Sequence, residues 1–154
     1  ACHLYGEPVP KTILDKWDFL AHPLIERLSQ DKEQLWSLFR NVTWWVPLTD
    51  SFVVTVPSGN DKRTMIGTIA GLRDELEQIN DMAWQADEET IYRWSETEGY
   101  PVEGERNSDD FSNMSNVQKN TKYDTQSLAK FCYSIFCRAL KFAEENQVTV
   151  VLIC

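Results

Sequence analysis

The sequence is poor in histidine and glycine, with two His and six Gly among 154 residues. A Cys–His nucleophilic pair would need His3 or His22 beside a thiol, and no local pattern places either one there. So few glycines leave little material for a phosphate-cradling loop. The sequence also has no P-loop, dinucleotide fingerprint, Gly-x-Ser-x-Gly elbow or His-Glu-x-x-His motif. These absences lower the odds of an enzyme.

Long apolar runs and clusters of basic residues are missing as well. No stretch approaches the roughly 20 apolar residues that a bilayer-spanning helix needs, and no N-terminal signal pattern is visible. The pI is near 4.7. A chain without a Lys/Arg cluster cannot neutralise phosphates, and its negative field is repelled by anionic membranes. We therefore expect neither nucleic acid nor a membrane as a partner.

The four cysteines lack the paired spacing of a zinc site or a redox motif; they are Cys2, Cys132, Cys137 and Cys154. Cys132 and Cys137 lie about 140° apart around a predicted helix, so they cannot bond to each other. We interpret the cysteines as reduced thiols of a cytoplasmic protein that holds no metal and no cofactor. The sequons at Asn41 and Asn113 would matter only in a secreted eukaryotic protein.

What the sequence does contain is a concentrated negative charge. The acidic segment 74–110 holds thirteen Asp and Glu against two Arg, a net charge of −11. The rest of the chain holds eleven acidic and thirteen basic residues, so the total is −9. Clustered carboxylates attract cations and repel polyanions. No spacing in the segment matches a calcium loop, so a solvated acidic face is favoured over a metal site.

Aromatic residues are interleaved with these charges: Trp84, Tyr92, Trp94, Tyr100 and Phe111. Carboxylates that steer and aromatics that anchor are the parts expected of a surface that binds a basic protein. The alternative is a solvated acidic surface whose aromatics pack inward. A second aromatic feature is the pair Trp44-Trp45, whose side chains point to opposite faces of a strand. Core packing of both is favoured, whereas an exposed Trp would mark a contact site.

The hydrophobic pattern predicts helices first and then a β segment. One helix is expected from Thr12, interrupted at His22-Pro23, and another from about Ser29 or Asp31 to Asn41. Strands are expected at 42–46 and 52–56, and residues 64–69 should pair back as an antiparallel hairpin.

The second half of the chain predicts helices around a polar loop. Apolar residues from Leu72 to Ala86 recur at helical spacing, and Thr90–Trp94 either extends this helix or forms a separate element. A polar loop 99–125 follows. An amphipathic helix over 127–145 should pack on the sheet through Phe131, Ile135 and Ala139. The apolar run 148–153 should be a buried, central strand.

These elements predict an α+β fold in one domain, 1–154: an antiparallel-containing sheet with a buried C-terminal strand, packed by several helices. The predicted function is a non-enzymatic module that binds a basic protein, such as an inhibitor or immunity protein neutralising a basic toxin or nuclease. Alternatives are a small carboxylate-dependent hydrolase or a structural subunit of a larger assembly. The oligomeric state stays open. The predicted partner-binding residues are Asp87, Glu88, Glu89, Trp94, Glu96, Glu98, Tyr100, Glu103, Glu105, Asp109 and Asp110.

Overall fold

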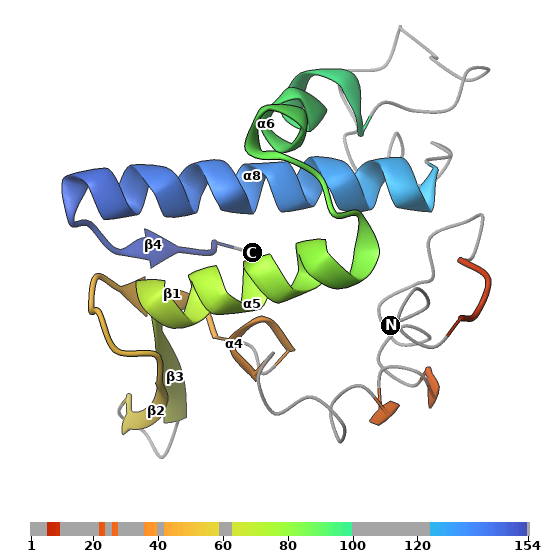
Figure 1. The fold of residues 1–154 in the computed structure, drawn as a ribbon. Helices are drawn as coiled ribbons and strands as arrows, with labels where there is room; N and C mark the ends of the chain where they lie inside the picture. Colours follow the sequence, from red (N-terminus) through yellow and green to blue (C-terminus); the bar gives the residue numbers. More distant parts are fainter. Residues whose placement is uncertain are drawn as a thin grey trace, which may run out of the picture.

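A computed structural model describes residues 6–9, 22–23, 26–27, 36–39, 42–58, 63–99 and 124–153 (Figure 1). Within them the elements follow the order α4 (Trp36–Phe39), β1 (Trp44–Val46), β2 (Val53–Pro57), β3 (Arg63–Thr68), α5 (Ile69–Ala83), α6 (Glu88–Thr97), α8 (Thr125–Asn146) and β4 (Val150–Val151). This is an α+β protein with a mixed four-stranded sheet, which confirms the predicted class. The predicted N-terminal helix and most of the polar loop lie outside the described residues.

The sheet has the strand order β2-β3-β1-β4. The predicted hairpin is present, because β2 and β3 pair antiparallel with Val54 opposite Ile66. Both strands have the predicted lengths but are displaced by one residue toward the turn, and Ile69 already begins α5. The pairing of β1 with β3 is parallel, with Trp45 opposite Gly67, and this was not predicted. Strand β4 closes the other edge antiparallel to β1.

The two tryptophans of β1 point to opposite faces of the sheet, as the strand period requires. Trp45 is 1% exposed and packs in the core, where its ring meets Phe136 edge-on. Its Nε1 donates to Ser37 Oγ of α4 at 2.9 Å. Trp44 is 48% exposed. The expectation that both pack in the core is therefore wrong for Trp44.

The sheet is buried on one face only. Val53, Gly67, Trp45 and Val150 share one row of paired positions on the face toward the helices. The other row of paired positions holds Val54, Ile66, Trp44 and Val151, three of which are exposed. We call this opposite side the outer face.

The acidic segment forms two helices rather than one. Thr68 caps α5 by accepting a hydrogen bond from Gly71 N at 3.1 Å. Helix α5 ends at Ala83, so Ala86 lies beyond it, and Gln85 adopts a left-handed φ of 50° at the turn. Asp87 then caps α6 by accepting from Thr90 N at 2.7 Å. A capped break of this kind separates the helices within four residues.

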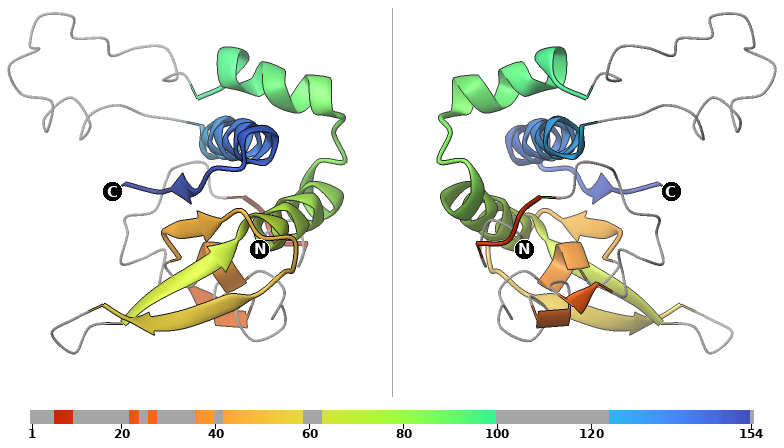
Figure 2. Two further views of the ribbon diagram at one scale, coloured as in Figure 1. Left: turned by 90° about the vertical axis from the view of Figure 1, so that its left-hand side faces the viewer. Right: turned by 90° about the vertical axis from the view of Figure 1, so that its right-hand side faces the viewer.

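Helix α8 matches its predicted bounds within two residues at each end, but not its predicted packing. It lies between α6 and the sheet, with α6 on its far side (Figure 2). Its buried residues are Tyr133, Ser134, Leu140 and Ala143, whereas Ile135 is 46% exposed. The prediction assumed that this helix packs against the sheet alone. Because the helix contacts α5, α6 and β4 on different sides, its buried residues lie on a different stripe of its surface from the predicted one.

The C-terminal strand is present, but it is neither central nor covered on both faces. Strand β4 comprises only Val150 and Val151 at the edge of the sheet. Val150 packs against the core, whereas Ile153 is 89% exposed. Its partner β1 is itself short because Pro47, which has no N–H to donate, follows directly. Past β4, Leu152 N still donates to Thr43 O at 2.9 Å, so the apolar run follows β1 for one residue beyond the strand.

Candidate functional site

The acidic face of α6 lies against a basic side of α8, which sequence reasoning missed. Glu88 accepts from Lys141 Nζ at 2.8 Å, and Glu96 lies 3.4 Å from Arg138 Nη2. Within α6, Glu89 pairs with Arg93 at 2.7 Å. The pKa of Glu88 is lowered, chiefly by its hydrogen bond with Lys141. Much of the predicted partner-binding charge is thus neutralised inside the molecule.

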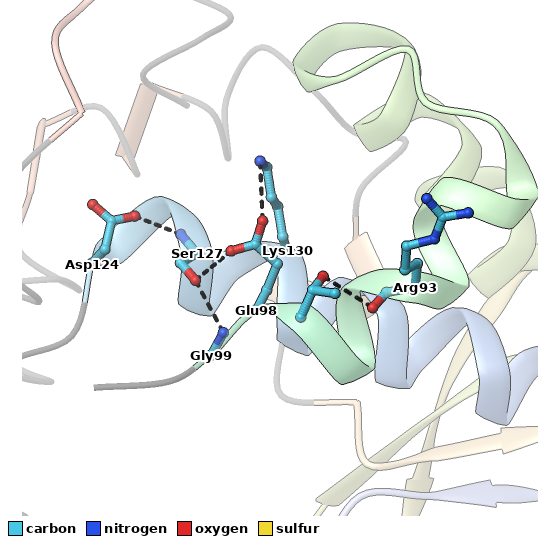
Figure 3. Close-up of polar contacts among 7 residues, drawn as sticks. Arg93, Glu98, Gly99, Asp124, Ser127 and Lys130 are labelled. Carbon is cyan, nitrogen blue, oxygen red and sulfur yellow. Dashed lines mark hydrogen bonds and ion pairs between the residues drawn. The ribbon is translucent and has the colours of Figure 1, made fainter. Parts of the chain in front are cut away.

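Glu98 also belongs to an internal network, centred on Ser127 at the start of α8 (Figure 3). Ser127 Oγ donates to Glu98 and accepts from Gly99 N at 3.0 Å, while Ser127 N donates to Asp124 at 2.7 Å. Lys130 Nζ lies 3.5 Å from the other oxygen of Glu98. These bonds tie the end of α6 to the start of α8. Gly99 and Asp124 thus bond to the same serine, Ser127.

Trp94, predicted as an exposed anchor, is 8% exposed. Its ring meets those of Trp84 and Tyr133 at centroid distances of 5.3 and 6.3 Å. The inward-packing alternative therefore holds for Trp94 as the structure places it. The remaining predicted site residues, Tyr100, Glu103, Glu105, Asp109 and Asp110, lie outside the described residues.

A groove of about 600 Å³ lies between α5, α6 and α8. Its walls include the apolar side chains of Leu76, Ile91 and Leu140 and the ring of Tyr133. Tyr133 is fixed because its hydroxyl donates to Leu76 O at 2.9 Å. Burial raises the pKa of this phenol, which stays protonated. We call this feature the helix groove.

Charge in the helix groove is predominantly negative. The groove is lined by two cations, Arg73 and Lys141, and by five carboxylates: Glu77, Asp81, Glu88, Glu144 and Glu145. Both cations are already paired within the groove, Arg73 with Glu144 and Lys141 with Glu88. The other three carboxylates, Glu77, Asp81 and Glu145, form no ion pair with any described residue.

The same imbalance holds for α5, α6 and α8 as a whole. With their capping residues they carry twelve carboxylates and five cations, and all five cations are in ion pairs. Of the seven remaining carboxylates, Asp87 and Asp124 cap helices and Glu75 is buried. Four form no ion pair with another described residue and cap no helix: Asp74, Glu77, Asp81 and Glu145. Three of these four line the helix groove. The pKa of Lys141 is raised chiefly by its hydrogen bond with Glu88, and the nearby charge of Glu145 contributes to this shift.

Of the predicted partner-binding residues that the structure describes, only Glu88 lines the helix groove. The unpaired carboxylates were missed for two reasons. Glu77 and Asp81 lie in the acidic segment but looked like an ordinary solvated helix face, and Glu145 lies outside the segment. A usable signal was present: the last turns of α5 and α8 carry no basic residue, although cations are favoured there.

Chemistry other than charge is sparse among the described residues. Within them, no three His, Cys, Asp or Glu side chains are grouped so that they could hold a metal ion. Cys132 and Cys137 are free thiols, and burial raises the pKa of both. None of the described helices is long and apolar enough to cross a membrane.

No protein-family model, curated protein or solved structure matches this chain.

Proposed function

We propose that this protein is a non-enzymatic module that binds a basic protein partner through its helical layer, α5, α6 and α8. The observation that carries the proposal is the charge imbalance of that layer: each of its five cations forms an ion pair, and four exposed carboxylates form no ion pair with any residue that the structure describes. Unpaired carboxylates keep a field that extends into solvent, and such a field accelerates encounter with a cationic surface.

The partner class that fits this charge best is a basic toxin or nuclease. An enzyme that cleaves nucleic acid needs positive charge around its cleft, because it must hold phosphates. An inhibitor of such an enzyme gains association rate and specificity from concentrated carboxylates. An immunity protein or inhibitor that occupies a basic cleft is therefore the most specific form of the proposal.

Carboxylate burial favours binding over hydrolysis. A hydrolase needs a carboxyl group whose pKa is raised toward neutrality, which requires burial beside the substrate. Among the described carboxylates, the one whose pKa is raised is Glu75, chiefly by burial. Both its oxygens accept from backbone amides of α4, Ser37 N at 2.9 Å and Leu38 N at 3.0 Å. Glu75 does not line the helix groove, whose unpaired carboxylates are exposed.

We also propose a cytoplasmic location. Its support is the free state of Cys132 and Cys137, since thiols persist in reducing compartments.

The test is capture of a partner from the native host, followed by association kinetics at increasing salt. The bait is the wild-type chain beside two variants of the four unpaired carboxylates, one with Asp/Glu→Asn/Gln and one with Asp/Glu→Lys. We expect a basic partner whose association slows with salt, because the Debye length falls from about 10 Å at 0.1 M to about 3 Å at 1 M. The amide variant should bind more slowly than wild type, and the lysine variant more slowly still. Salt-independent association that is equal for all three baits would contradict the proposal.

A further inference from the structure

The free edge of β4 and an exposed apolar stripe on α8 lie on the same side of the molecule. Among the described strands, β4 is at one edge of the sheet. Helix α5 contacts β3 and β1, whereas α8 contacts β4, so α8 is the helix nearer this edge. Figure 2 shows α8 end-on, with α6 on its far side and β4 extending beneath it away from α5. The side of α8 opposite α5 therefore faces outward above β4.

The apolar stripe on this side of α8 is formed by Ile135 and Phe142. Phe142 is 61% exposed, and Ile135 is exposed as well. The two residues are seven apart, so they lie on one side of the helix. Tyr133, whose hydroxyl bonds to α5, lies about 160° around the axis from Ile135. The stripe therefore points away from α5, and its helical neighbours Phe131 and Ala139 add no charge to it.

The free edge of β4 is able to pair with another strand. Leu152 N donates to Thr43 O at 2.9 Å, so the backbone groups of Leu152 face β1. In an antiparallel ladder, the adjacent residue turns its N–H and C=O the other way. Val151 therefore presents both groups to the free edge, and its side chain is 41% exposed. Edge strands are usually blocked by charged residues or proline, and the run 148–153 contains neither.

The absence of charge on this side indicates which partner it fits. The chain has a net charge of −9, and Glu144 of the helix groove lies on the opposite side of α8 from Ile135. A basic protein finds no carboxylate in the stripe or in the run 148–153 with which to pair. A second copy of this chain meets no like charge there. An identical strand also satisfies the free backbone groups reciprocally across a two-fold axis.

We propose that a second copy of this chain docks on this side, about a two-fold axis perpendicular to the sheet. The two β4 strands pair antiparallel with Val151 opposite its counterpart, so that one sheet runs through both copies. Ile135 and Phe142 of each copy project over the joined strands and pack against those of the other copy. The helix grooves stay on the outside of this dimer, so the dimer does not depend on the basic partner proposed above.

The first test is sedimentation equilibrium of the full chain over a wide range of concentration. We expect a mass that rises from 17.9 kDa to twice that value and no further, because a two-fold interface is closed. The interface variant is Ile135→Glu with Phe142→Glu. The matched control is Val54→Glu with Phe52→Glu, which changes two exposed residues and the same net charge at the opposite edge of the sheet. We expect dimerisation to weaken at least about tenfold in the interface variant and less than about twofold in the control.

The strand pairing is tested through the backbone. Val151→Pro removes an N–H that does not bond to β1, and an edge strand tolerates proline at such a position. Dimerisation should therefore weaken at least about tenfold, while circular dichroism shows that the fold is kept. In the wild type, hydrogen exchange of the Val151 amide should slow as concentration rises.

Four results would overturn the proposal. The first is a mass that stays at 17.9 kDa at every concentration. The others are association beyond two copies, an equal loss in the interface and control variants, and wild-type dimerisation of Val151→Pro. A Val151 amide equally protected at all concentrations would also overturn it, in favour of cover by a segment of the same chain.

Discussion

The outer face of the sheet and the helical layer expose opposite kinds of surface. The four strands contain a single charged residue, Arg63, and present exposed Trp44, Val54 and Val151 on their outer side. The three long helices with their caps carry twelve carboxylates and five cations. In the sheet, stability depends on which face a side chain occupies. In the helical layer, most charges are paired on the surface, and such pairs contribute little to stability. The charges are thus concentrated on the surface of the same helices that supply most of the described buried core.

The sharpest test of this comparison is the tryptophan pair, which should give the largest effect. Trp45→Ala should lower the free energy of unfolding by about 3–5 kcal/mol, because it empties a core position that Phe136 and Ser37 contact. Trp44→Ala, on the outer face, should cost less than about 1 kcal/mol. Urea denaturation of both variants measures the difference. Equal losses would show that the outer face is covered in solution.

A second test concerns the buried carboxylate that links α5 to α4. Glu75→Gln should cost about 1–3 kcal/mol at neutral pH, because an amide cannot accept from both Ser37 N and Leu38 N. The pKa of Glu75 is raised from 4.5, mainly by burial. A raised pKa means that the stability contributed by protonation is fully present below pH 4.5 and is lost as pH rises through the folded value.

The wild type should therefore gain stability relative to Glu75→Gln as the pH falls from 7 to 4. Chemical denaturation of both proteins across this range measures the difference. Asp87, the exposed N-cap of α6, should show the opposite dependence of stability on pH, because its pKa is lowered by the hydrogen bond from Thr90. Relative to Asp87→Asn, the wild type should lose stability on acidification. A pH-independent difference for Glu75→Gln would contradict the assignment of a buried, titrating carboxylate.

The smallest effects should come from the exposed charges, and they should differ in sign. Asp81→Asn with Glu145→Gln removes negative charge from two helix C-termini, so we expect a gain of about 0.3–1 kcal/mol in unfolding free energy. Glu89→Gln removes a carboxylate from the first turn of α6 and its pair with Arg93, so it should cost a few tenths of a kcal/mol. Thermal unfolding at low salt resolves both. A loss of stability in the double variant Asp81→Asn with Glu145→Gln would show that these carboxylates have a structural role.

Local features of the fold could be predicted from the sequence, and features that depend on distant neighbours could not. The hairpin and α8 were found because their periodicity and turn residues are contained in short windows. The edge position of β4 was missed, since an apolar run reads the same in a central strand and in a short edge strand.

The site shows the same limit. A count of charges along the chain located the acidic segment. It could not show that some of these carboxylates form ion pairs with distant cations, because Glu88 and Lys141 are 53 residues apart in the sequence. The same count passed over Glu145, which becomes part of the groove only when α8 packs beside α5. The absence of cations from the last turns of two helices was visible in the sequence. It acquires meaning only once both turns are known to border one groove.

The strand order also determines when this protein can finish folding. Strand β1 is flanked by β3, about 20 residues later in the chain, and by β4, more than 100 residues later. Closing so long a loop carries an entropic cost that is repaid only when the last contacts form. During synthesis, the β4 side of Trp44 and Trp45 must stay open until Val151 has left the ribosome. The nascent chain therefore exposes an unpaired edge of β1 from the synthesis of this strand until that of β4, and an unpaired strand edge is prone to association with other chains.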